Sequence, residues 1–255
     1  MNVLAVEALT LRAGGTGRVL CSGLSFAIAA QQCWVLLGPN GAGKSTLLAT
    51  IAGLMLPSQG DVHLGARPLA QWPLDALARE RAWCPPHWID PFPATVAETV
   101  DLTRAGDDAP NAQSLRLLLQ RLDIAALADA DVRTLSAGER QRVALAAAWW
   151  QGAPLLLLDE PASHLDLSHR EQLVALLHAH LQDGGGAVVS VHDLDLAWRI
   201  ATHAVLLDGR GGVTAGARDA VMQPERLSDA YDVPVSWVEA CGQRRFWIGA
   251  RPEAA

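Results

Sequence analysis

A run of small residues that ends in lysine, serine and threonine is the part of the sequence best suited to chemistry. It fits the pattern G-x-x-x-x-G-K-[ST], which is typical of loops that bind phosphate. The residues of this phosphate loop are Gly38, Pro39, Asn40, Gly41, Ala42, Gly43, Lys44, Ser45 and Thr46. Glycine lets the backbone curl so that successive N–H groups point toward phosphate oxygens. The pattern therefore predicts a phosphate site rather than an ordinary glycine turn with a surface lysine.

The segments on either side of the phosphate loop agree with this prediction. Residues 34–37 are apolar and read as a short buried strand, and residues 47–52 read as an apolar helix. Strand, glycine-rich loop and helix is the arrangement that such sites use, because the helix adds its positive N-terminal end. In this arrangement Lys44 can reach the β- and γ-phosphates of a nucleotide. The Ser45 hydroxyl can ligate Mg²⁺.

Two carboxylates and one histidine follow apolar runs further along the chain. Residues 155–158 are all leucine and lead into Asp159 and Glu160, and residues 187–191 lead into His192. Such runs are typical of parallel strands covered on both faces. We expect Asp159 to hold Mg²⁺, directly or through water, and Glu160 to act as general base toward water, with a solvated turn as the alternative. His192 is interpreted either as a γ-phosphate sensor or as a structural imidazole.

A second stretch of small residues lies at the start of a predicted helix. Its residues, the signature stretch, are Leu135, Ser136, Ala137, Gly138 and Glu139. Ser136 can cap a helix that runs to about Trp150, and a helix N-terminus is another site for an anion. One phosphate cannot be held by two helix ends from distant parts of one chain without help. We therefore expect a second subunit to present this stretch across the nucleotide.

The elements that must position these residues read as an α/β fold. Residues 1–33 alternate between apolar and polar, which predicts antiparallel strands, and residues 135–231 alternate between strands and helices. Proline and glycine interrupt helical spacing in 86–134, which predicts a helical subdomain inserted into the core. We place the core in 1–85 and 135–231, and a terminal hairpin or tail in 232–255.

Apolar spacing also predicts the individual elements of this fold. Helices are expected at residues 74–81, 95–104, 114–122, 124–127, 136–150, 168–181 and 195–201. Further strands are expected at residues 61–64, 204–207, 233–240 and 244–249.

Composition limits the kind of partner that the protein can have. The net charge of −7 argues against nucleic acid as a partner, because proteins bind its phosphate backbone with basic surfaces. The apolar runs are shorter than the roughly 18–20 residues that a membrane span needs, and the first residues predict no signal peptide. The cysteines have no metal-ligand spacing, so we expect buried free thiols in a reducing cytosol: Cys21, Cys33, Cys84 and Cys241.

Taken together, these motifs resemble the nucleotide-binding subunit of an ATP-binding cassette (ABC) transporter. The phosphate loop, the signature stretch, residues 155–160, the loop from Ser163 to Asp166 and His192 occur in that family's order. The resemblance implies a P-loop NTPase cassette with a RecA-like parallel-sheet core, an N-terminal antiparallel β subdomain and an inserted helical subdomain. It implies ATP and Mg²⁺ as cofactors, Glu160, His192 and Lys44 as catalytic residues, and Ser163 and Asp166 as the family's D-loop.

Within the family, the chain is most similar to ATPases that import metal chelates, namely cobalamin, ferric siderophores or haem. The stretches that suggest this are residues 67–69, 79–83, 93–96, 192–197 and 230–233. The resemblance implies a head-to-tail homodimer that holds two ATP molecules, with two membrane-spanning permease subunits and, indirectly, an external substrate-binding protein. The expected location is therefore the cytoplasmic face of the inner membrane, reached through the permeases.

Three positions depart from the family's pattern. Pro86 stands where a glutamine usually senses Mg²⁺, so that contact is lost or moves to His87. Ala137 replaces a signature glycine, and its methyl either crowds the facing γ-phosphate or is tolerated if φ stays negative. No aromatic residue stands where one usually stacks on adenine, and Arg12 is a candidate replacement.

Two other functions stay open at this point. The departures at Pro86 and Ala137 suit a cassette that clamps on ATP without hydrolysing it. A soluble ABC protein that does not transport is the other alternative. For the importer, we expect the apolar residues Trp88, Ile89 and Phe92 to line a groove that receives a helix of the membrane subunit, or else to pack inside the helical subdomain.

Overall fold

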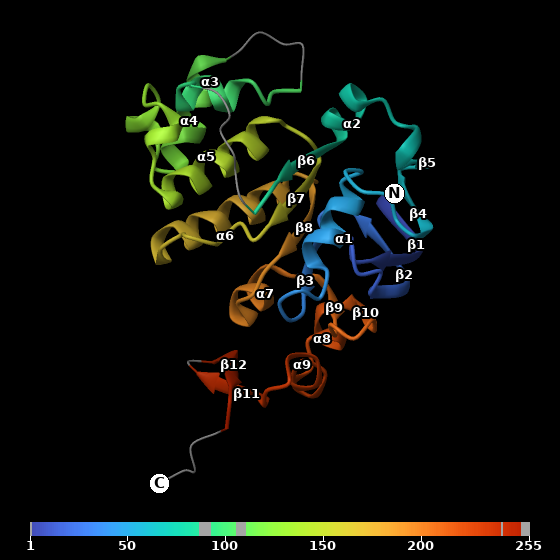
Figure 1. Cartoon of the computed structure of the whole chain (residues 1–255). Coiled ribbons are helices and arrows are strands. Elements are labelled where there is room, and N and C mark those ends of the chain that lie inside the picture. Colours follow the sequence, from blue (N-terminus) through green and yellow to red (C-terminus); the bar gives the residue numbers. More distant parts are fainter. Residues whose placement is uncertain (1, 87–92, 106–110, 241, 251–255) are drawn as a thin grey trace.

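The protein is described by a computed structural model that covers residues 2–86, 93–105, 111–240 and 242–250. A six-stranded sheet in the order β10-β9-β3-β8-β7-β6 forms its centre (Figure 1). The strands are β3 (Cys33–Leu37), β6 (Arg81–Cys84), β7 (Leu155–Asp159), β8 (Gly186–Ser190), β9 (His203–Leu207) and β10 (Val213–Ala217). All neighbours in this sheet pair in parallel except β10, which runs antiparallel to β9.

The central strands are apolar throughout because both faces of the sheet are covered. Along β3, Cys33, Val35 and Leu37 face one buried cluster, while Trp34 and Leu36 belong to another. This alternation follows from the two-residue period of a strand. Because β3, β7 and β8 pair in parallel, they end at the same edge of the sheet. Ligands bind at this edge in open α/β folds.

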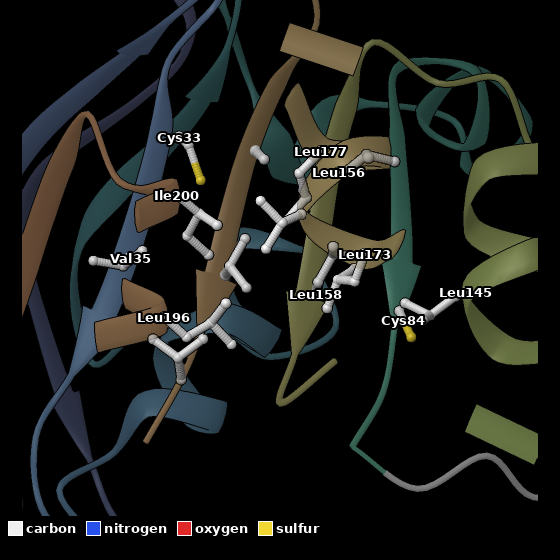
Figure 2. Packing of buried hydrophobic residues seen from close by; sticks show 14 of the residues in the cluster. Cys33, Val35, Cys84, Leu145, Leu156, Leu158, Leu173, Leu177, Leu196 and Ile200 are labelled. Carbon is white, nitrogen blue, oxygen red and sulfur yellow. The ribbon is translucent and has the colours of Figure 1, made fainter. Parts of the chain in front are cut away.

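Helices cover one face of this sheet. They include α5 (Ala137–Trp150), α6 (Leu167–Gln182) and α7 (Leu194–Ile200). Figure 2 shows side chains of β7, such as Leu156 and Leu158, among Leu173 and Leu177 of α6. Burying large aliphatic side chains in this way contributes about 1.5–3 kcal/mol each.

The second face of the central sheet packs on α1 (Lys44–Ile51) and on an antiparallel sheet. The order of that sheet is β2-β1-β4-β5. Its strands are β1 (Asn2–Arg12), β2 (Val19–Ala29), β4 (Gln59–Leu64) and β5 (Arg67–Pro68). The antiparallel strands that the N-terminal alternation predicts are therefore present.

A group of helices lies apart from the antiparallel sheet (Figure 1). It contains α3 (Val96–Asp101), α4 (Ala112–Arg121) and two 3₁₀ turns, η2 (Ala125–Leu127) and η3 (Val132–Thr134). Thr95 and Glu98 form a capping box that starts α3. The group is tied to α5, because Trp150 Nε1 donates to Asp101 Oδ1 at 3.0 Å and Thr103 Oγ1 donates to the Ala147 carbonyl at 2.9 Å.

The C-terminal segment consists of two short helices and a hairpin. They are α8 (Arg218–Val221), α9 (Pro224–Tyr231), β11 (Val235–Ala240) and β12 (Gln243–Ile248). Trp237 and Phe246 of the hairpin pack on Trp198 of α7, with ring centroids 4.7 and 5.9 Å from that of Trp198. The antiparallel pairing of β11 with β12 confirms the predicted terminal hairpin.

The element predictions were wrong in a few places. The helix expected at 74–81 is α2 (Leu74–Glu80), preceded by the turn η1 (Leu69–Gln71), and Arg81 already belongs to β6. Apolar spacing missed β6 because its first residue, Arg81, was assigned to the preceding helix. It also missed β10, α8 and α9. The domain boundaries at 86–134 and 232–255 stay a prediction.

Two statements from composition can be compared with the structure. No helix among the described residues is long and apolar enough to cross a membrane. Cys21, Cys33 and Cys84 are buried free thiols, and burial raises the pKa of Cys33 and Cys84 to about 12. Cys241 lies outside the described residues.

Candidate active site

The phosphate loop connects β3 to α1 and depends on glycine at two positions. Gly38 has φ of 138°, and a side chain there would run into the backbone carbonyl of Leu207 on β9. Gly43 caps α1 with φ of 107°, and no side chain caps the helix. The N-terminal N–H groups of α1 are thus left for a ligand, as the sequence predicts.

Lys44 is folded back onto this loop and buried, with 6% of its surface exposed. Its Nζ donates to the carbonyl oxygens of Gly38, at 2.7 Å, and Pro39, at 3.2 Å. Burial lowers the pKa of Lys44, and the nearby carboxylates of Glu160 and Asp159 oppose that shift. The ammonium is therefore held at the loop by backbone carbonyls and by the field of two acids.

Asp159 ends β7 and faces Ser190 at the end of β8, where the two residues are paired across the sheet. Asp159 is 1% exposed, and its Oδ1 accepts a hydrogen bond from Ser190 Oγ. Its Oδ2 is buried without a partner among the described residues. An orphaned carboxylate oxygen beside a phosphate loop suits a cation, so Asp159 and the Ser45 hydroxyl fit Mg²⁺.

Glu160 and His192 lie together at the same edge of the sheet. Glu160 Oε1 is 2.6 Å from His192 Nε2, and Oε2 accepts from the hydroxyl of Ser163 at 3.3 Å. Glu160 has φ of 50°, and its backbone N–H donates to Ser190 Oγ at 2.8 Å. Ser190 thus contacts the Asp159 carboxylate and the backbone of Glu160. Sequence reasoning missed this role, for which the only signal is a position two residues before His192.

A cavity of about 270 Å³ lies over the phosphate loop, and Glu160 lines it whereas Asp159 and His192 do not. Its lining includes Lys44, Ser45, Thr46 and Glu160 together with Arg18, whose Nη2 donates to the Gly41 carbonyl at 2.6 Å. Sequence reasoning missed Arg18, and it proposed Arg12 for the adenine contact. Arg12 instead donates to the Gly17 carbonyl at 2.9 Å and does not line this cavity.

The signature stretch forms the start of α5, as predicted. Ser136 caps the helix, accepting from the N–H of Glu139 at 3.3 Å, and the Glu139 carboxylate accepts from the N–H of Ser136 at 2.7 Å. Ala137 is the first helical residue and has no positive φ, so its methyl causes no backbone strain. Leu135 is buried. None of the signature residues lines the phosphate cavity of the same chain.

Comparison with known proteins agrees with this arrangement. A family model described as ABC transporter matches residues 21–163, a stretch that contains the phosphate loop, the signature stretch and Glu160. The chain belongs to the ABC transporter family. The predicted ABC cassette fold is confirmed, and so is the prediction of an ABC-type transport ATPase that binds ATP.

Curated ABC relatives cover most of this cassette. The hemin import ATP-binding protein HmuV of Nocardia farcinica is 40% identical over 88% of this chain and 80% of its own length. HmuV of Streptomyces coelicolor is 38% identical over 86% of this chain and 80% of its own.

Solved structures of ABC proteins share the fold. One is described as a metal-chelate type ABC transporter in an inward-facing conformation. It has a TM-score of 0.80 and 23% identity over 99% of both chains. An ATP-binding subunit of an ABC transporter has a TM-score of 0.78 and 26% identity, over 88% of this chain and 94% of its own.

The loop between β7 and α6 contacts the signature helix of the ABC cassette. A Cβ on Gly138 would lie 2.9 Å from the carbonyl oxygen of His164, so the two segments pack closely. The side chain of Gln141 donates to the Pro161 carbonyl at 3.2 Å. A movement of α5 would therefore displace the loop that contains Glu160 and Ser163.

Asp166, which the family resemblance predicts to belong to a D-loop, has a structural role within its own chain. It caps α6 by accepting from the N–H of His169 at 2.9 Å, and its contacts with His169 and Ser168 lower the pKa of Asp166 to about 2. His169 Nε2 lies 2.8 Å from Arg142 Nη1 on α5. Sequence reasoning missed the contact between Arg142 and His169 because the two residues are 27 positions apart.

The departure at Pro86 can be followed only in part. β6 ends at Cys84, and Pro86 is half-buried just beyond it. His87, Trp88, Ile89 and Phe92 lie outside the described residues. The metal contact expected of His87 and the groove expected around Trp88 stay predictions.

Proposed function

We propose that this chain hydrolyses ATP to power the import of haem, or of a related chelate such as cobalamin or a ferric siderophore, through membrane-spanning partners. The observation that carries the catalytic part is the contact between Glu160 Oε1 and His192 Nε2, 2.6 Å, beside the phosphate cavity. The names of the curated relatives support haem as the cargo.

In the proposed reaction, the oxygen of a water attacks the γ-phosphorus of ATP. Glu160 accepts a proton from that water, while the bond to the β-γ bridging oxygen breaks and ADP leaves. His192 orients the Glu160 carboxylate and contacts the γ-phosphate. Lys44 and the backbone N–H groups at the start of α1, residues 43–46, neutralise the negative charge that develops on the phosphate oxygens.

Asp159 and Ser45 are the residues that would hold Mg²⁺. The ion supplies charge stabilisation to the phosphate oxygens when it is bound. Ser190 keeps Asp159 Oδ1 occupied, which leaves the buried Oδ2 to face the metal side. The expected task of Ser190 is thus to orient the acid rather than to bind the ion.

The functional unit in this proposal is a head-to-tail homodimer. The signature stretch of one subunit completes the phosphate site of the other, because it does not line the cavity of its own chain. The D-loop residues Ser163 and Asp166 would lie near this interface. Two ATP molecules would be enclosed per dimer.

The proposal also includes two permease subunits, which would hold the ATPase at the cytoplasmic face of the inner membrane, and an external substrate-binding protein. An exposed apolar stretch supports a partner, since Leu54, Met55 and Leu56 lie beside a cavity of about 110 Å³ lined by Pro57, Leu69 and others. Leu56 is 85% exposed. A water-facing surface of this kind suits a short apolar helix of a membrane subunit.

Reconstitution tests the cargo directly. The chain would be placed in vesicles together with the membrane protein that co-purifies with it. ATP hydrolysis would then be measured with binding protein loaded with haem, cobalamin or a ferric siderophore. Stimulation by haem alone is the expected result. A cassette that clamps on ATP without turnover, the alternative that Pro86 favours, would show ATP binding with no hydrolysis under any load.

A further inference from the structure

Tyr231 joins the C-terminal segment to the phosphate loop. It is the one tyrosine of the sequence and the last residue of α9. Its hydroxyl oxygen accepts a hydrogen bond from the backbone N–H of Gly38 at 2.9 Å, across 193 positions of sequence. Gly38 is the first residue of the phosphate loop. The helix α9, which lies outside the sequence motifs, therefore holds the loop where it begins.

Gly38 is held from more than one side. Its N–H is bonded to Tyr231, and its carbonyl accepts from Lys44 Nζ at 2.7 Å. Its α-carbon faces the Leu207 carbonyl so closely that a side chain would not fit. The hydroxyl of Tyr231 and the ammonium of Lys44 therefore both bind Gly38. Loss of one hydrogen bond would shift Gly38 and so change the geometry of the other.

The phenol of Tyr231 is suited to this single contact. The ring packs against the main buried cluster, and burial raises the pKa of Tyr231, which keeps the hydroxyl neutral. Phenylalanine would fill the same space but leave the Gly38 N–H without that acceptor. Leaving a partly buried N–H without an acceptor costs free energy in the folded state. The phosphate loop would then leave its phosphate-binding conformation more readily.

The same C-terminal segment contacts the other half of the site. After Tyr231, Asp232 turns the chain with φ of 55° into the hairpin. The N–H of Phe246 then donates to Asp195 Oδ1 at 2.9 Å, on the helix that follows His192. The segment from α9 to β12 thus reaches both the phosphate loop and the helix beside the catalytic histidine.

We propose that Tyr231 is a positioning residue for ATP binding, which holds the phosphate loop in its binding shape through the N–H of Gly38. The proposal rests on the proposed ATPase function of the same site. In the absence of this bond, part of the free energy of ATP binding would be spent on ordering the loop. Chemistry after binding would be little affected, because the bound phosphates themselves hold the loop.

The test is Tyr231→Phe in the full chain, with Ser228→Ala as the matched control. Ser228 lies on the same helix, and its hydroxyl contacts the Pro224 carbonyl and the N–H of Val235 but not the phosphate loop. For Tyr231→Phe we expect the Kd and KM for ATP to rise about three- to tenfold, which is the loss expected for one hydrogen bond, with kcat within about twofold. Hydrogen exchange at the Gly38 amide should accelerate, while Ser228→Ala should lower only thermal stability.

Unchanged ATP affinity and unchanged Gly38 exchange in Tyr231→Phe would overturn the proposal. So would a variant whose exchange and affinity change no more than those of Ser228→Ala, since the hydroxyl would then serve the fold alone. Failure of the proposed ATPase is distinguished by wild-type protein that binds ATP but does not hydrolyse it. In that case, the binding and exchange measurements still decide whether Tyr231 positions the loop.

Discussion

His192 Nε2 lies 2.6 Å from Glu160 Oε1, although the two residues are 32 positions apart in the sequence. Each follows a buried strand, Glu160 directly after β7 and His192 two residues after the end of β8, and the parallel pairing of those strands brings them to one edge. The carboxylate that we propose as general base is therefore oriented by the imidazole. Replacing each residue separately would test the role of Glu160 as base and that of His192 in orienting it.

Replacing Glu160 by glutamine should abolish turnover and preserve ATP binding. The amide has nearly the same shape but cannot accept the proton of the attacking water. Loss of about two orders of magnitude or more in kcat is expected, with an ATP-loaded dimer accumulating in gel filtration. Glu171→Gln is the control, because Glu171 pairs with Arg199 on the surface away from the cavity. Near-normal steady-state hydrolysis in Glu160→Gln would remove it from the base role.

His192→Ala should lower kcat more than it weakens ATP binding. The imidazole is expected to orient Glu160 and to sense the γ-phosphate, both of which matter chiefly in the transition state. We expect kcat to fall about a hundredfold to a thousandfold, within the range for general acid–base partners. His178→Ala, an exposed histidine of α6, is the matched control. If both variants hydrolyse ATP equally well, His192 is structural.

Lys44→Ala should lose nucleotide affinity at least tenfold, because one charge-assisted contact to phosphate is worth about 1.5–3 kcal/mol. Calorimetric titration with ATP measures the loss. The sequence contains no second lysine. An amine-reactive reagent should therefore label only Lys44 and the N-terminal amine, and ATP should protect Lys44 alone. Labelling that ATP does not slow would contradict the phosphate-loop assignment.

Ser136→Arg should stop hydrolysis without weakening ATP binding to dilute monomer, because its target is the nucleotide of the other subunit. The change also removes a helix cap worth about 1 kcal/mol. Thr95→Ala removes the equivalent cap of α3 and should leave hydrolysis intact. Equal loss of ATP affinity in monomeric Ser136→Arg and Lys44→Ala would mean that the signature acts within its own chain.

A mixture of Ser136→Arg and Lys44→Ala subunits sharpens that test. In a head-to-tail dimer of one subunit of each kind, both lesions fall on the same composite site, and the other site is intact. We expect hydrolysis to reappear on mixing, although neither variant is active alone. No recovery despite dimer formation would argue against composite sites.

Leu56→Asp should weaken assembly with the membrane subunit while leaving ATP binding and thermal stability nearly unchanged. Leu56 is 85% exposed, so the free subunit loses little packing when the side chain becomes charged. Recovery of the complex by affinity purification measures the effect, and Ile248→Asp on the terminal hairpin is the control. Trp88→Ala is expected to weaken assembly in the same assay. Normal recovery with Leu56→Asp would place the docking surface elsewhere.

The motifs at the strand ends could be predicted from short stretches of sequence. The phosphate loop could be predicted because its local backbone conformation requires glycine. Gly38 and Gly43 both have positive φ angles. Residues 155–158 and 187–191 could be read as strands because burial on both faces leaves an unbroken apolar run. Ser136 could be read as a helix cap from its neighbours alone, and the capping box with Glu139 lies within a single turn.

Which distant residues meet these motifs depends on the tertiary fold. Tyr231 reaches Gly38, Ser190 reaches Asp159, and His164 leaves no room for a side chain on Gly138. The short strand β6 exists because β7 supplies its hydrogen bonds. Such contacts depend on where the sheet and helices place residues that lie far apart in the chain. Periodicity and spacing report on local backbone and burial, so they carry no information about these partners.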